Sequence, residues 1–175
     1  MHRITSGGPA DFEAASVFWA EFFDKHDRSP EYLVKRYLGA AGILFAIARA
    51  GDELVGLTLG MPARTGSASE GVPELFPIKT LFTHPAHRRT GIGRGVLEHL
   101  VADARNAGYT RFQLWVHTGN QAACSLYESL GFRADGAPAH DNEGTSITRF
   151  IRRAEQQKRA APAEPPFFLN PPNHP

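Results

Sequence analysis

The chain has 175 residues, of which 42% are hydrophobic, so it is long enough to bury one core without disulfides or structural metal ions. Its 19 basic and 18 acidic side chains leave a net charge of +1, which gives no general reason to expect a nucleic acid or an anionic membrane as partner. A single cysteine, Cys124, excludes an internal disulfide and a multi-cysteine zinc site, and no stretch has the length of a membrane span or the apolar run of a signal peptide. We therefore expect one soluble, cytoplasmic domain.

The first part of the chain carries two helical patterns followed by strand patterns. Apolar residues recur at three- and four-residue spacing from Asp11 to His26, which predicts an amphipathic helix. A second helix is expected after Ser29, which can cap its free amides, with Pro30 at the first helical position and an end near Gly39. Two strands, Ile43 to Arg49 and Glu53 to Leu59, are then expected to form an antiparallel hairpin. A Gly- and Ser-rich loop, Arg64 to Pro73, leads to a further strand, Phe76 to Thr83.

The second part begins with helical periodicity from Val96 to Ala104, which stops at Gly108. A strand is expected at Arg111 to His117, followed by a helix from Gln121 to Leu130 that Asn120 caps and Gly131 ends. Two final strands are expected at Phe132 to Ala134 and Ser146 to Arg152. The strand, helix, strand order requires parallel neighbours joined by a right-handed crossover within an otherwise antiparallel sheet. The predicted class is α/β (α+β), a mixed sheet flanked by helices.

The composition changes after residue 153. Residues 154–175 are charged at first and then proline-rich, and such a run cannot continue a helix or enter the interior of a sheet. We expect a domain over 1–153 and a C-terminal tail over 154–175. Two interpretations of the tail stay open: Phe167, Phe168 and Leu169 dock on this chain or a neighbour, or the tail is solvated.

The segment most informative about chemistry is Ile78 to Leu100, where a strand, a proline turn and a glycine-rich loop lead directly into a helix. Free amides at a helix start carry partial positive charge, and glycines let a phosphate approach the backbone closely. Three arginines surround these glycines, so a local pyrophosphate site is predicted in a nearly neutral protein. A nucleotide P-loop fits badly because Arg94 and Gly95 follow Gly93, and the glycine spacing does not match a dinucleotide fingerprint.

At these residues the chain resembles the GNAT superfamily of acyl-CoA-dependent N-acyltransferases, whose hallmark is Arg/Gln-x-x-Gly-x-Gly/Ala between the fourth strand and the third helix. The matching residues here read Arg88-Arg89-Thr90-Gly91-Ile92-Gly93. A second element, residues 120–132 with the sequence NQAACSLYESLGF, is similar to the fourth helix of the family. The resemblance covers roughly Ile43 to Arg153. It implies the GNAT-like fold, a mostly antiparallel sheet with a parallel strand pair at its centre.

The resemblance also implies roles for individual residues. Backbone groups of Leu81, Phe82 and Thr83 would pair with the pantetheine arm and the thioester carbonyl of acetyl-CoA. The pyrophosphate would be held by backbone amides of one loop, contributed by Arg88, Arg89, Thr90, Gly91, Ile92, Gly93 and Arg94. Asn120 would contact the coenzyme, and Tyr127 would place its hydroxyl near the sulfur and protonate the departing thiolate.

The general base is the position where the chain departs from the family. Members often carry an acidic residue early in the fourth strand, whereas this chain has Pro77, Ile78 and Lys79 there. The nearest titratable side chains are His117, His84 and Glu74, and we favour His117 among them. Each histidine has the simpler interpretation of a residue at a strand end. Cys124 lies in the middle of a predicted helix, where a packing role is expected.

Three functional hypotheses follow. The first is an N-acetyltransferase that moves an acetyl group from acetyl-CoA to a primary amine of a small molecule or peptide by direct attack in a ternary complex. The second is a non-catalytic acyl-CoA-binding or sensing module, because the missing strand carboxylate is compatible with lost chemistry. The third, nucleic-acid binding through the arginines, is disfavoured by the near-neutral charge. We expect acetyl-CoA as co-substrate, no metal, no nucleic acid or membrane partner, and we leave a homodimer open.

Overall fold

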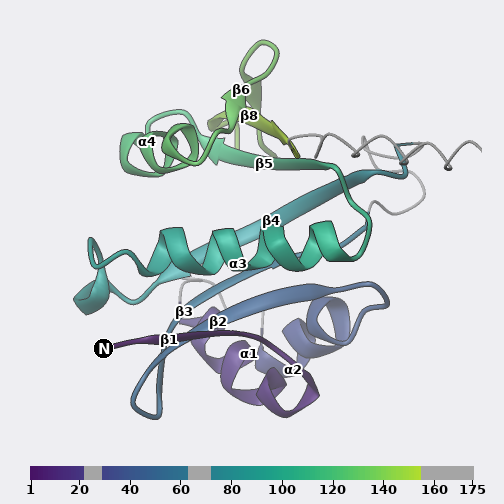
Figure 1. Ribbon diagram of the computed structural model, residues 1–175. Coiled ribbons are helices and arrows are strands. Elements are labelled where there is room, and N and C mark those ends of the chain that lie inside the picture. The colour runs from purple at the N-terminus through teal and green to yellow at the C-terminus, as the bar shows by residue number, and fades with distance from the viewer. Residues whose placement is uncertain (22–28, 63–71, 155–175) are drawn as a thin grey trace, which may run out of the picture.

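The computed structural model describes residues 1–21, 29–62 and 72–154 (Figure 1). An eight-stranded mixed sheet forms its centre, with β1 (Arg3–Ser6), β2 (Leu44–Ala50), β3 (Glu53–Gly60), β4 (Leu75–Thr83), β5 (Arg111–His117), β6 (Arg133–Ala134), β7 (Ala139–His140) and β8 (Ser146–Arg153). The helical elements are η1 (Pro9–Asp11), α1 (Phe12–Ala20), α2 (Pro30–Leu33), η2 (Val34–Leu38), η3 (Pro85–His87), α3 (Ile92–Asn106) and α4 (Gln121–Ser129). The predicted α/β class is confirmed.

The strands follow the order β1-β2-β3-β4-β5-β8-β6, with β7 beside β8. Neighbours are antiparallel except β4 and β5, which form the predicted parallel pair at the centre. Two core clusters cover the two faces of the sheet. One joins α3 to β2, β4 and β5, and the other joins α1, α2 and η2 to β2 and β3. Figure 1 shows α3 crossing one face while α1 and α2 lie together away from it.

The longest helix, α3, forms because its apolar residues recur on one side. Its buried side chains are spaced three or four positions apart, or adjacent on the same face, at Ile92, Val96, Leu97, Leu100, Val101 and Ala104. The helix ends before Gly108, whose φ of +99° favours glycine. Among the described residues, no helix is long and apolar enough to cross a membrane.

Several predicted boundaries differ from the structure. The first predicted helix starts as the short η1 turn, and α1 ends at Ala20 with Glu21 as its C-cap. The remaining predicted residues, 22–26, lie outside the described residues. The second is one α-helical turn that widens into the π-helical η2. The strands β1 and β7 were not predicted, because runs of four and two residues are too short to show alternation. Most of the predicted loop (residues 64–71) and the tail from residue 155 lie outside the described part of the chain.

The parallel strands β4 and β5 pair only over their first residues, from Leu75 opposite Arg111 to Pro77 opposite Gln113. Just after this stretch the register between β3 and β4 shifts by one residue. Gly60 pairs with Ile78 and Leu59 pairs with Thr80, so Lys79 is an additional residue in β4. A bulge of this kind bends its strand and increases its twist. β4 therefore diverges from β5, while β5 stays paired with β8 along its whole length, and Figure 1 shows the opening widen toward α4.

Candidate active site

The N-terminus of α3 leaves its first amides without helical acceptors. Gly91 is the N-cap residue, and its φ of +86° is a left-handed conformation that glycine adopts without strain. The first intrahelical bond runs from the Gly95 amide to the Gly91 carbonyl, at 2.9 Å. No side chain of the described residues caps this end, and no acidic residue lies in its first turn. The amides of Ile92, Gly93 and Arg94 are therefore available to an anion.

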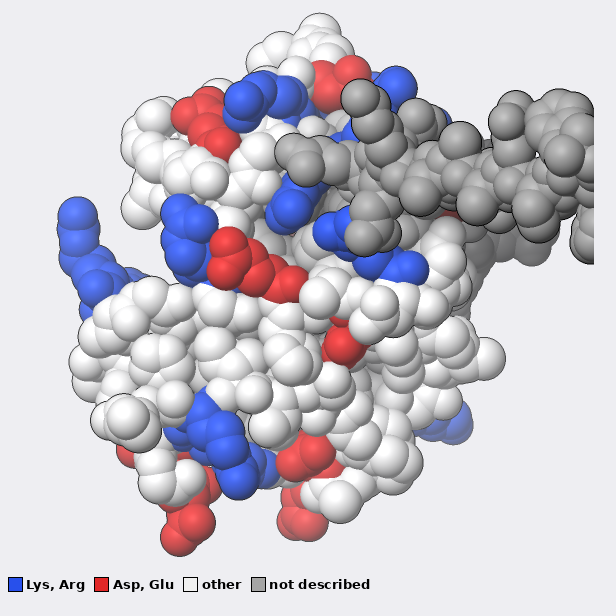
Figure 2. Space-filling model, viewed as in Figure 1, with Lys and Arg blue, Asp and Glu red and all other residues white. Residues whose placement is uncertain are grey.

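Basic side chains add charge around this helix start. Figure 2 shows Lys and Arg side chains projecting at the left edge of the molecule, where Figure 1 places the loop before α3. Arg88 and Arg89 belong to this loop, and Arg89 has a φ of +61°, which is unusual for a residue with a side chain. The guanidinium of Arg94, in contrast, bonds Glu98 at 3.4 Å and Ser129 at 2.6 Å, so the open group that Arg94 offers at this helix start is its backbone amide.

The loop itself is held by local hydrogen bonds. Thr90 donates its hydroxyl to the carbonyl of His87 at 2.6 Å. Ile92 buries its side chain against Gly56 of β3, where a β-carbon would come within 2.5 Å of it. These contacts fix the path of the backbone on both sides of Gly91, so the open amides are held in place without a bound ligand.

The outer half of β4 presents backbone groups to the opening beside β5. His84 donates its amide to the carbonyl of Val55 on β3, at 2.9 Å. Because bonded pairs alternate along an antiparallel ladder, Phe82 also bonds β3, whereas Leu81 and Thr83 direct their N–H and C=O groups to the other side. That side is the opening, since β5 has left β4 by Pro77. Of the three predicted strand residues, Leu81 and Thr83 have the orientation for pairing with an extended ligand.

Helix α4 lies against the start of α3. A β-carbon placed on Gly93 would lie 3.4 Å from the hydroxyl of Thr83 and 3.6 Å from Leu126, so β4, α3 and α4 converge at this glycine. Asn120 is the N-cap of α4, and its Oδ1 accepts a bond from the Ala123 amide at 3.1 Å. Its side-chain NH2 group is then the part that can contact a ligand.

Tyr127 is positioned by packing on the inner side of α4. It is 8% exposed and its ring lies about 6 Å from the rings of Phe132 and Phe150. Burial, with a smaller contribution from Cys124, raises the pKa of Tyr127 to about 12. The phenol therefore keeps its proton throughout the physiological range.

With the uncapped helix start and the free backbone groups of the diverging strand described, the chain can be compared with known proteins. The model of the acetyltransferase (GNAT) family matches residues 12–132. The chain belongs to the GNAT acetyltransferase family.

Among its relatives, N-acetyltransferase 8 of Homo sapiens is 30% identical over 131 residues, which are 73% of this chain and 56% of that protein. The [ribosomal protein bS18]-alanine N-acetyltransferase of Escherichia coli K12 is 46% identical over 48 residues, 27% of this chain and 32% of that protein. The chain spans about half the length of the curated relatives it matches.

Solved structures of the family share the fold. The ribosomal-protein-S18-alanine N-acetyltransferase from Escherichia coli superposes with a TM-score of 0.70 at 19% identity, over 92% of this chain and 99% of that one. The yncA protein from Salmonella typhimurium, solved with its cofactor acetyl-CoA, gives a TM-score of 0.73 at 19% identity, over 93% and 98%. The resemblance and the GNAT-like sheet expected from the sequence are thereby confirmed.

Within this GNAT fold, His117 lies at the end of β5 and bonds an aspartate that the sequence analysis did not identify. Its Nε2 lies 3.2 Å from Oδ2 of Asp141, and its side chain is 62% exposed. Phe112, Leu114 and Val116 alternate with it and point into the core on the α3 side, so His117 points to the opposite face. Asp141 also accepts the amides of Glu143 and Thr145, and the bond from Thr145 is the main reason that its pKa is lowered.

The other two predicted bases flank the two ends of β4. Glu74 precedes β4 at the closed end of the strand pair, where its carboxylate meets Arg111 at 3.7 Å and its carbonyl accepts the Arg111 amide. At a rise of about 3.3 Å per residue this is roughly 30 Å from Thr83, which removes Glu74 as a candidate base at the opening. His84 follows β4 directly, and its Nδ1 accepts the Ala86 amide at 3.3 Å. It groups with Glu53 and His87, two residues that the sequence analysis did not identify as functional candidates.

Cys124 has the packing role expected for it. Its side chain is partly buried against the α3-side core, and burial is the main cause that raises the pKa of its thiol. A raised thiol pKa lowers the fraction of reactive thiolate, which disfavours an acyl-cysteine route.

Proposed function

We propose that the protein is an N-acetyltransferase that transfers an acetyl group from acetyl-CoA to a primary amine of a small molecule or peptide, by direct attack in a ternary complex. The observation that carries the proposal is the uncapped start of α3 beside the free edge of β4. A diphosphate fits the first site and an extended amide-containing arm fits the second. The two are adjacent because Gly93 lies next to Thr83.

In this proposal the amides of the loop from Arg88 to Arg94 hold the pyrophosphate, with Arg88 and Arg89 adding positive charge. Leu81 and Thr83 bond the pantetheine arm as an added strand would. The backbone amide of Thr83, which points to the opening, stabilises the oxyanion, an effect typically worth about 3 kcal/mol per donor. The acetyl-CoA held by the yncA structure, which shares this fold, supports acetyl-CoA as the donor.

The acceptor must lose a proton before it attacks. An alkylammonium with a pKa of about 10.4 is neutral in only about one molecule in 2500 at pH 7, which corresponds to roughly 4.6 kcal/mol. We assign the base role to His117, with Asp141 as its positioning residue. When Nε2–H of His117 donates to the Asp141 carboxylate, Nδ1 carries the lone pair that accepts the proton, and the same carboxylate stabilises the imidazolium that forms.

Tyr127 acts at the leaving group. A phenol with a pKa of about 12 is a permanent hydrogen-bond donor, but it is a weaker acid than an ordinary thiol, whose pKa is about 8.5. We therefore assign Tyr127 a hydrogen bond to the sulfur as negative charge develops there. This replaces the complete proton transfer that the resemblance to the GNAT superfamily implied.

A thiol-release assay tests the proposal. Tag-free protein is incubated with acetyl-CoA and a panel of small amines and peptide N-termini, and products are identified by mass spectrometry. Acetylated amine and free CoA in equal amounts are expected with at least one acceptor. Tight acetyl-CoA binding without thiol release from any amine would instead support the acyl-CoA-binding module, and no binding of CoA by calorimetry would overturn both functions.

The base assignment has its own test. His117→Ala should lower kcat/KM about 100-fold near pH 7, within the usual range for loss of a general base, and the deficit should shrink as the pH rises and more acceptor is neutral. Asp141→Asn should show a smaller loss of about tenfold and a shifted pH profile. His99→Ala, which removes another histidine beside a carboxylate, is the matched control. Equal activity in His117→Ala and the control at every pH would contradict the assignment.

A further inference from the structure

We propose that Glu53, His84 and His87 form a binding site for a divalent transition-metal ion of the zinc type. One ligand atom from each of the three side chains lies within 4.8 Å of the other two. This proposal does not rest on acyl transfer, because none of the three residues has been assigned a role in the reaction above.

The separations are close to those of a bound ion. Zinc bonds to imidazole nitrogen and carboxylate oxygen are about 2.0 to 2.1 Å long, so ligands in a tetrahedral site lie about 3.4 Å apart. The three atoms need to approach by little more than 1 Å, which side-chain rotation supplies. The rings of His84 and His87 already face edge to plane with centroids 5.8 Å apart.

The backbone holds these side chains together without a ligand. Glu53 begins β3 directly after the turn at Gly51, and His84 bonds Val55 of the same strand through its amide. Pro85 opens the 3-10 turn η3, in which the His87 amide bonds the His84 carbonyl at 2.9 Å. Side chains three residues apart eclipse each other in such a turn, so the spacing His-Pro-Ala-His places both rings on one side.

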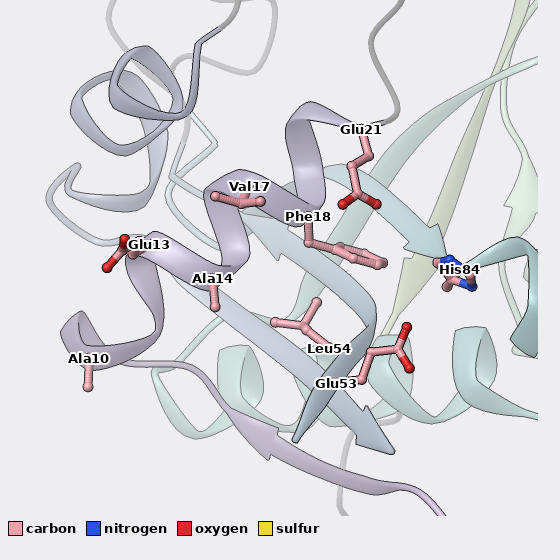
Figure 3. A pocket seen from close by; sticks show the side chains of 9 residues that line it. All are labelled: Ala10, Glu13, Ala14, Val17, Phe18, Glu21, Glu53, Leu54 and His84. Carbon is pink, nitrogen blue, oxygen red and sulfur yellow. The ribbon is translucent and has the colours of Figure 1, made fainter. Parts of the chain in front are cut away.

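The donor set selects the class of metal. Two imidazoles and one carboxylate suit Zn²⁺, Co²⁺ or Ni²⁺, whereas Ca²⁺ and Mg²⁺ prefer oxygen ligands throughout. Three protein ligands leave a fourth position open for water. Glu53 and His84 also line a hollow of about 520 Å³ beside α1, and Figure 3 shows both side chains at one end of it, near Glu21. The open coordination position can therefore be reached from solvent.

One contact must change when the ion binds. His84 now uses Nδ1 to accept the Ala86 amide, at a distance of 3.3 Å. If the ion binds Nε2, the lone pair of the neutral imidazole must be on Nε2. Nδ1 would then carry the proton and could no longer accept the Ala86 amide. Coordination through Nδ1 would replace the amide by the metal. A hydrogen bond of this length is weak, so either change costs little.

A second cluster with similar composition does not meet these conditions and provides the control. Ser6 donates to Asp103 at 2.6 Å and lies 2.9 Å from Nε2 of His99, which is also the nitrogen nearest Asp103. This group offers one imidazole only, and its hydroxyl proton already bonds the carboxylate. His99→Ala therefore removes a histidine beside a carboxylate without touching the proposed site.

Metal binding should stabilise the loop next to it. His87 immediately precedes Arg88, and its carbonyl accepts the Thr90 hydroxyl. An ion shared by β3, the end of β4 and η3 would join these segments. At a metal concentration 100 times the dissociation constant, linkage predicts a rise in Tm of about 5 to 10 °C for a chain of this size.

The test uses the full chain without a histidine tag and without acetyl-CoA. Calorimetry with Zn²⁺ should show one ion per chain with a micromolar dissociation constant, and Co²⁺ should give the visible absorption of a tetrahedral site. His87→Ala and Glu53→Ala should each weaken binding at least tenfold and abolish the rise in Tm, whereas His99→Ala should match the wild type. No one-to-one binding by the wild type, or equal binding by His87→Ala, Glu53→Ala and His99→Ala, would overturn the proposal. Acyl transfer is measured separately, so neither result depends on the proposed function.

Discussion

The two helices beside the opening, α3 and α4, begin in opposite ways. Helix α4 starts at Asn120, whose side chain accepts the Ala123 amide, and its chain continues with the regular bond from Cys124 to the Asn120 carbonyl. Helix α3 starts at Gly91, which has no side chain to offer, and no other described residue caps it. Both helices face the same physical problem, because every helix leaves its first amides without internal partners.

The difference separates two uses of a helix start. A capping side chain typically stabilises a helix by about 1 kcal/mol, and α3 does without that contribution. It can do so because its stability comes from six buried apolar residues along 15 positions, whereas α4 has nine residues and buries mainly Tyr127. The well-packed helix therefore has its amides available for an anion, and the short helix uses a cap to hold a tyrosine in place.

The strongest test of this contrast places a carboxylate in the first turn of α3. Gly93→Asp should weaken CoA binding at least about 100-fold, because its charge would lie where the pyrophosphate is proposed to bind. The same change should leave Tm equal or higher, since an acidic residue near a helix N-terminus is favourable. Calorimetry with CoA and thermal unfolding measure the two effects.

Gly93→Ala is the matched control for space without charge. Its β-carbon would meet Thr83 and Leu126 at ordinary contact distances, so the fold should tolerate it. If Gly93→Asp bound CoA as tightly as Gly93→Ala, the start of α3 would not be an anion site.

The next test concerns the buried tyrosine of α4. Its pKa is about 12 in the folded protein and about 10 in the unfolded chain, so the unfolded state loses its proton first as the pH rises. Below about pH 10 the tyrosine is protonated in both states and the free energy of unfolding keeps its full value. Between pH 10 and 12 the free energy of unfolding falls by about 2 to 3 kcal/mol. Denaturant unfolding of wild type and Tyr127→Phe across this window measures it. Parallel curves for the two proteins would contradict the burial of the hydroxyl.

A smaller effect is expected for Tyr127→Phe in catalysis. Loss of the hydrogen bond to the sulfur should lower kcat about 30-fold, close to 2 kcal/mol, while CoA affinity stays within a factor of two. Steady-state kinetics with the acceptor found above, and calorimetry with CoA, separate the two quantities. A tyrosine that only fills the core would lower Tm in the phenylalanine variant without this selective loss of kcat.

The sequence predicted the elements that carry long periodic patterns. α3, α4 and β5 appear close to their expected bounds, because apolar spacing over seven or more residues defines both type and face. The glycine loop was found from local chemistry, since a helix start is a short-range feature. Strands β1 and β7 were missed because their stability comes from pairing with β2 and β8.

The parts of the site formed by distant segments could not be predicted in the same way. Asp141 lies 24 positions from His117 and meets it only because β7 and β8 fold back beside β5. Glu53 reaches His84 through the pairing of β3 with β4. The His-Pro-Ala-His spacing was visible in the sequence, but a metal set needed the carboxylate that only the sheet register provides. Glu74 is close in sequence to the residues of the site, but it precedes the start of β4, at the end of this strand opposite Thr83.

The smallest expected effects come from the cap of α4, where two roles of Asn120 divide between two atoms. Its Oδ1 caps the helix, and its NH2 group is the proposed contact with the coenzyme. Asn120→Ala removes both and should lower stability by about 1 kcal/mol, or about 2 to 4 °C in Tm, whereas Asn120→Asp keeps the capping oxygen and should retain the Tm. Both variants should weaken CoA binding three- to fivefold, because both lose the NH2 donor. Equal destabilisation by aspartate and alanine would show that α4 is not held by its cap, and the contrast with α3 would then disappear.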